Sequence, residues 1–74
     1  MMRKFHNFFD YEYAKYRAEE LKLSQYKLAD KLNTTQQCIN NWFNGKVIPN
    51  LYFVVMIADL LKLPVQNLIK DVDE

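Results

Sequence analysis

The sequence predicts an all-α domain built from five short helices. Apolar residues recur at intervals of three and four along most of the 74-residue chain, which is the spacing of one helix face. Each expected helix from the first to the fourth follows an Asp, Ser, Thr or Asn that can cap its first turn. Only one Gly and two Pro interrupt the chain, so long linkers and low-complexity segments are absent.

The length allows one domain, since typical domains have about 100–150 residues. Half of the residues are apolar and 15% are aromatic, so a compact helical core is feasible at this size. We expect an aromatic and basic N-terminal arm over residues 1–9, a helical domain over residues 10–69 and a charged tail over residues 70–74.

The expected arm carries Arg3 and Lys4, which could reach along DNA. Its aromatic side chains either cover the core or contact a second copy of the chain; with the first residues of the next helix they are Phe5, Phe8, Phe9, Tyr11 and Tyr13. His6 has no second ligand or acidic partner nearby in the sequence, so no chemistry is assigned to it.

The first expected helix is capped by Asp10 and runs to about Leu21, with Ala14 and Ala18 on its inward side. A second helix begins after Ser24, and its inward side comprises Leu28, Ala29 and Leu32. Asn33 tolerates the left-handed conformation that a helix stop requires, although Gly adopts it more easily.

The third expected helix is capped by Thr34 or Thr35, and its inward side is Ile39, Trp42 and Phe43. It ends at Asn44-Gly45, because Gly enters the left-handed region without steric cost. With the three apolar residues turned inward, the outward or flanking surface is made of amides: Gln36, Gln37, Asn40 and Asn41.

These amides suggest a chemistry for the third helix. Gln and Asn each carry a donor and an acceptor on one planar group, which matches the N6/N7 edge of adenine in the major groove of DNA. A solvated polar face would satisfy the same pattern. An ordinary solvated face, however, would mix Lys and Glu among the amides.

Asn50 can cap a fourth helix from Leu51 to about Leu61, after Pro49. Its run LYFVVMIADLL is apolar nearly all round, and four residues suffice for the core: Leu51, Val54, Ala58 and Leu61. Part of the rest should therefore lie outside the core, on a homodimer surface or under the N-terminal arm: Tyr52, Phe53, Val55, Met56 and Leu60. The segment 62–64 then breaks the helix, and a short fifth helix spans Val65 to Ile69.

Composition excludes several classes of function. One Cys forms no internal disulfide, no Cys/His set builds a zinc site, and Cys38 is expected to be a small packing residue. No apolar run reaches the roughly 20 residues of a membrane span, and a cytoplasmic protein without cofactor or metal is expected. Glu19 and Glu20 are adjacent and cannot converge as an acid/base pair, and no nucleophile, base and orienting group can be assembled, so an enzyme is not expected.

The net charge is only +1, but it is distributed unevenly. Residues 1–23 sum to +1, residues 24–50 to +2 and residues 51–74 to −2. The pair of helices at the centre is therefore the most basic part of the chain. We expect a shallow salt dependence of DNA binding, because few phosphates are neutralised per subunit.

Residues 14 to 69 resemble the Cro and lambdoid phage repressor family of helix-turn-helix proteins, a five-helix lambda-repressor-like fold with its helix-turn-helix at residues 24–44. The ordered spacing of the matching residues carries the resemblance: Ser24-Gln25, Leu28-Ala29, Leu32-Asn33, Thr34-Thr35-Gln36-Gln37, Ile39, Asn44-Gly45-Lys46, Pro49 and Leu61-Lys62-Leu63. The TTQQ segment is similar to one repressor subgroup in which paired glutamines read bases.

The resemblance implies that Gln36, Gln37 and Asn41 face base edges, with Asn40 beside them. It also implies phosphate contacts from Gln25, Thr35, Asn44 and Lys46. Val47 and Ile48 stand where relatives commonly carry another basic residue. Compensation could come from Lys27 and Lys31, or from Lys15 and Arg17, which are otherwise ordinary solubilising side chains.

A second departure concerns the packing of the third helix. Related domains often pair an Arg in the first helix with a Glu just before the Asn-Gly of the recognition helix. Here Ala18 and Phe43 occupy those positions, and the loss of both charges avoids leaving one of them buried and unpaired. We expect the Phe43 ring to fill the space of the ion pair against the first helix.

The sequence therefore predicts a sequence-specific, DNA-binding transcriptional regulator, a repressor that binds a palindromic operator of double-stranded DNA as a dimer. The candidate dimer contacts are Tyr52, Phe53 and Met56, or the N-terminal aromatics. The alternative is an antitoxin-like or protein-interaction module whose main partner is another protein.

Overall fold

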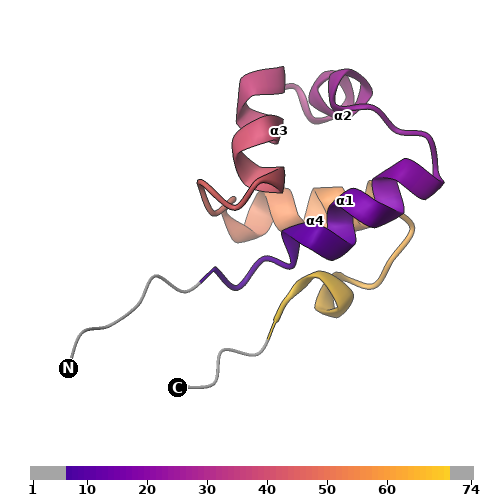
Figure 1. Cartoon of the computed structure of the whole chain (residues 1–74). Helices are drawn as coiled ribbons and strands as arrows, with labels where there is room; N and C mark the ends of the chain where they lie inside the picture. The colour runs from indigo at the N-terminus through magenta and orange to yellow at the C-terminus, as the bar shows by residue number, and fades with distance from the viewer. Residues whose placement is uncertain (1–6, 71–74) are drawn as a thin grey trace.

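The computed structural model describes residues 7–70, and it shows four α-helices followed by a short 3-10 helix. The bounds are Tyr11–Glu20 for α1, Gln25–Leu32 for α2, Gln36–Phe43 for α3, Leu51–Leu60 for α4 and Val65–Leu68 for η1. The all-α fold class is confirmed, with one difference: the expected fifth helix is a single 3-10 turn. In Figure 1, α2 and α3 lie side by side at one end of the domain, and η1 lies at the other end.

Each α-helix begins at a side chain that accepts a hydrogen bond from a backbone N–H of the first turn, which satisfies one of the donors left free there. Thr35, rather than Thr34, is the cap of α3, and its hydroxyl oxygen accepts from the Cys38 amide at 3.1 Å. The other caps are those expected from the sequence: Asp10 for α1, Ser24 for α2 and Asn50 for α4.

The helices end in left-handed residues, as expected at two of these positions. Asn33 has φ of 57° after α2, and Gly45 has φ of 76° after α3. After α1 and α4 the left-handed residues are Lys22 and Lys62, with φ of 59° and 58°. In both cases the next amide donates to a carbonyl of the last turn, and this closes the helix in a Schellman motif.

One hydrophobic core joins all five elements. The helix α1 packs against α3 and η1, while α4 packs against η1 and α2. Trp42 of α3 also stacks on Phe53 of α4, with ring centroids 4.9 Å apart. The buried apolar residues include all those expected on the inward sides of α2 and α3; the full set is Phe9, Ala14, Ala18, Leu28, Ala29, Leu32, Ile39, Trp42, Phe43, Val54, Ile57, Ala58, Leu61 and Leu68.

The expected core face of α4 was wrong at one position. Leu51 is 56% exposed, and Ile57 is fully buried in the stripe that it forms with Val54, Ala58 and Leu61. Side chains on a helix lean toward its N-terminus, so the side chain of the first residue leans off the packed stretch. Periodicity places Leu51 near the correct side of the helix but does not reveal that the core ends beneath Val54.

The segments that flank the helical domain are paired with each other. Phe9 forms an antiparallel bridge with Ile69, the Lys70 amide donates to the Phe8 carbonyl at 2.7 Å, and the Asp10 amide donates to the Leu68 carbonyl at 2.8 Å. Phe9 is fully buried and packs on Phe43, with ring centroids 6.2 Å apart. Of the two alternatives left open for the N-terminal aromatics, Phe9 therefore takes the first and covers the core.

Other expectations fall on residues that the structure does not describe. The arm residues Arg3, Lys4, Phe5 and His6 lie outside residues 7–70, as does the tail from Asp71. Between residues 7 and 70, no helix is long and apolar enough to cross a membrane, and no group of three or more metal-ligating side chains is present.

Candidate nucleic-acid interface

The two central helices are joined by a tight turn with defined geometry. The turn is closed by Asn33, whose left-handed conformation lets the Thr34 amide donate back to the Ala29 carbonyl of α2 at 2.9 Å. The chain then extends at Thr35 and enters α3 directly. Because both helix ends are fixed by hydrogen bonds and the inward sides of both helices are buried, α3 is held at one orientation against α2.

The outward side of α3 is made of amides. Ile39, Trp42 and Phe43 are buried, whereas Gln36 and Gln37 are exposed and Asn40 and Asn41 are half-buried at the flanks. This is the division expected from the sequence. The two glutamines lie in the first turn of α3, where a helix that enters the major groove meets base edges.

Two of these amides are coupled. The Gln37 side chain donates from Nε2 to Oδ1 of Asn41 at 3.2 Å, one helical turn further along. One Nε2 hydrogen and the Oε1 acceptor of Gln37 remain free, which is the combination that adenine N7 and N6 require. Asn41 therefore orients Gln37 in addition to presenting its own amide.

The C-terminal end of α3 is held by α1 and by its own backbone. The Asn41 carbonyl accepts from the amides of Lys46 and Val47, at 2.9 and 3.2 Å. Gly45 lies so close to the Tyr11 ring that a Cβ at this position would come within 2.7 Å of a ring carbon. Both the left-handed conformation and the close approach favour Gly here.

A contact that sequence reasoning missed joins α1 to this end of α3. Lys15 donates from Nζ to the Asn44 side-chain oxygen at 3.3 Å, so Lys15 lies beside one of the expected phosphate contacts. Lys46 is exposed two residues further on. Two ammonium groups and an amide thus converge where the chain leaves α3. Pairing between residues 15 and 44 is not visible in either local pattern, because they are distant in the sequence.

The remaining expected phosphate contacts lie at helix N-termini. Gln25 is the first residue of α2, Lys27 is exposed in the same turn, and Thr35 caps α3. Helix N-termini present free amides and partial positive charge, which suits phosphate. Arg17, considered above as a compensating cation, is engaged elsewhere: it donates to the Leu61 carbonyl at 3.0 Å and pairs with Glu20 at 3.1 Å.

The space between α1 and α3 contains a phenyl ring where related domains often have an ion pair. Phe43 is 1% exposed and Ala18 is 3% exposed, and both line a hollow of about 210 Å³ between α1, α2 and α3. Within residues 7–70 the Arg17–Glu20 contact is the only ion pair, so no charged pair bridges this gap. This agrees with the expected placement of the ring.

Comparison with known families agrees with this geometry. A family model described as helix-turn-helix matches residues 14–68, which covers α2, α3 and the packing helices around them. The chain belongs to the Cro- and repressor-like helix-turn-helix family. A search of curated proteins found no match to this chain.

Membership of this helix-turn-helix family makes the chain a DNA-binding regulatory domain. In such domains the second helix of the motif enters the major groove and the first crosses the backbone. In this chain those helices are α3 and α2. The family assignment reaches this coarse function, and the individual contacts are argued below.

Proposed function

We propose that this helix-turn-helix protein is a sequence-specific transcriptional repressor that reads a palindromic operator as a dimer. The observation that carries the proposal is the composition of the α3 outward side, where every polar residue from Gln36 to Asn41 is a neutral amide. Neutral amides contribute little to nonspecific attraction to phosphates, whereas their paired donor and acceptor discriminate between bases. Such a side is suited to reading sequence.

The proposed base contacts are Gln36, Gln37 and Asn41, with Asn40 at the flank. Proposed phosphate contacts surround them at the helix ends. This division places the sequence-reading groups at the centre and the positioning groups at the edge, as in most protein–DNA interfaces. The phosphate set is Gln25, Lys27, Thr35, Asn44 and Lys46.

An exposed apolar surface on α4 supports the dimer. Tyr52 is 68% exposed, Val55 49% and Leu51 56%, while Phe53 and Met56 are half-buried beside them. The Tyr52 ring also packs edge-on against Phe53, with centroids 5.5 Å apart. Apolar patches of this kind mark protein contacts. A second copy seated on this surface would bring two α3 helices to one duplex.

Replacing Tyr52 by Ala should weaken self-association. An exposed aromatic anchor at the centre of an interface typically contributes about 2 kcal/mol or more, so the dissociation constant of the dimer should rise at least about 30-fold. Tyr16→Ala is the matched control, because Tyr16 is 58% exposed on α1, away from this surface. Sedimentation equilibrium measures both variants; equal dissociation constants for Tyr52→Ala and the unchanged protein would contradict the α4 interface.

Selection of bound duplexes from a random pool tests sequence reading and symmetry together. The expected outcome is a consensus made of two inverted half-sites whose centres lie about one helical turn, roughly 34 Å, apart. An adenine should appear where Gln37 meets the half-site. A pool that shows no consensus would refute the proposal, and a single unrepeated half-site would remove the dimer from it.

The same α4 surface also favours a second candidate function, in which the main partner is another protein, as in an antitoxin. This candidate predicts that a heterologous protein covers Tyr52 and Val55. Co-purification of one partner in equal amounts, lost in the Tyr52→Ala variant, would support it. It does not compete with DNA binding, because the α3 amides remain free.

A further inference from the structure

The end of the domain formed by the C-termini of α1, α2 and α4 carries a groove that DNA binding leaves unused. Two adjoining hollows of about 470 and 410 Å³ share Lys31, Asp59 and Leu60. Their volumes lie within the roughly 300–1,000 Å³ of typical binding pockets. Neither hollow includes a residue of α3 or any proposed DNA contact, so a ligand seated there leaves the nucleic-acid interface free.

The floor of the groove is apolar. Leu21 and Leu23 come from the turn between α1 and α2, and Leu60 comes from the last turn of α4. The second hollow extends this floor along α4 through Met56 and Val55, of which Val55 is 49% exposed. The floor therefore runs along α4 for more than one helical turn, which matches the footprint of an amphipathic helix packed into a groove.

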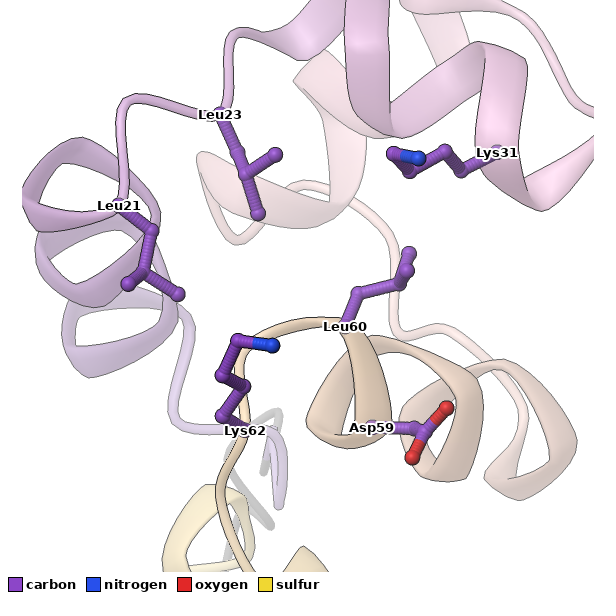
Figure 2. A pocket seen from close by; sticks show the side chains of 6 residues that line it. All are labelled: Leu21, Leu23, Lys31, Asp59, Leu60 and Lys62. Carbon is purple, nitrogen blue, oxygen red and sulfur yellow. The ribbon is translucent and has the colours of Figure 1, made fainter.

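The rim of the first hollow is cationic. In Figure 2 the side chains of Lys31 and Lys62 reach toward the space between the three leucines from opposite sides, whereas the Asp59 carboxylate points away from it. Neither lysine forms an ion pair with any residue between 7 and 70. A carboxylate brought in by a ligand would therefore gain two uncompensated ammonium groups.

We propose that this groove binds an amphipathic helix of a partner protein whose leucine-like apolar side is flanked by acidic residues. The apolar side would cover Leu21, Leu23 and Leu60, and its carboxylates would pair with Lys31 and Lys62. Charge complementarity selects this occupant over a basic helix. The position of the groove makes the partner a protein that joins the regulator while it is bound to DNA.

The test uses the full chain and two synthetic amphipathic peptides. Both peptides carry leucines at positions i, i+3, i+4 and i+7; one has glutamates flanking them and the other has lysines. Binding is followed by methyl NMR of Leu21, Leu23 and Leu60. The expected result is saturable shifts of these methyls with the glutamate peptide and binding at least about fivefold weaker with the lysine peptide, because two exposed ion pairs are exchanged for repulsion.

The double variant Lys31→Glu, Lys62→Glu should reverse this preference and favour the lysine peptide. DNA binding of the same variant should be unchanged, since neither lysine is a proposed DNA contact, and this confirms that the variant is folded. Equal binding of both peptides by the unchanged protein would overturn the proposal, because it would reduce the groove to an unselective apolar hollow. Absence of methyl shifts with the glutamate peptide up to about 1 mM would overturn it as well.

Discussion

Replacing Phe43 by Ala should remove most of the stability of the domain. Phe43 is 1% exposed, packs on the Phe9 ring and lines the space beside Ala18. Phe→Ala substitutions in cores cost about 3–5 kcal/mol, and a 74-residue domain has only roughly 4–11 kcal/mol in total at typical stability per residue. Thermal unfolding followed by circular dichroism should show a midpoint lowered by at least about 12 °C.

Phe43→Leu is the control for this prediction. It keeps an apolar side chain of similar size, so the cost should remain below about 1.5 kcal/mol. A second variant tests whether the ring stands in for an ion pair. Ala18→Arg with Phe43→Glu should be more stable than the sum of the two single changes implies, because neither charge is then left unpaired. Near-normal stability of Phe43→Ala would contradict the buried placement of the ring.

Replacing Phe9 by Ala should have an effect of similar size, although Phe9 precedes the first helix. Its ring is fully buried against Phe43, and its backbone bridges Ile69. The expected loss is again about 3–5 kcal/mol in the free energy of unfolding, measured by urea denaturation. The loss reflects the cavity left between the terminal segments and α3.

Phe8→Ala is the matched control, since Phe8 is the same residue type one position earlier and is only half-buried. It should cost clearly less than Phe9→Ala. If the two substitutions cost the same, the specific placement of the Phe9 ring in the core would be wrong. If neither cost more than about 0.5 kcal/mol, the range of a surface substitution, both rings would belong to a peripheral arm.

The features predicted correctly from the sequence are local ones. The cap at Ser24, the left-handed stop at Asn33 and the inward side of α3 each depend on residues within one or two helical turns. Helical periodicity and capping chemistry act over that range, so they are legible in the sequence. The amide side of α3 follows directly from them, because the outward residues are those left when the apolar ones turn inward.

The features that were missed depend on contacts between distant segments. Pairing of Phe9 with Ile69 joins the two ends of the described chain, and the Lys15–Asn44 contact joins α1 to the end of α3. An aromatic residue that covers the core and one that lies on a surface have the same local pattern. Leu51 shows the converse: it fits the periodicity of α4, but the domain provides no core beneath the start of that helix.

The most direct test of the central claim compares Gln37→Ala with Lys46→Ala on the selected duplex and on random DNA. Gln37→Ala should cost about 1–3 kcal/mol on the selected duplex and little on random DNA, because a base contact carries sequence information. Lys46→Ala should weaken both about equally and reduce the salt dependence by about one ion, as expected for a phosphate contact. Equal losses for Gln37→Ala on the two DNAs would contradict sequence reading by the α3 amides.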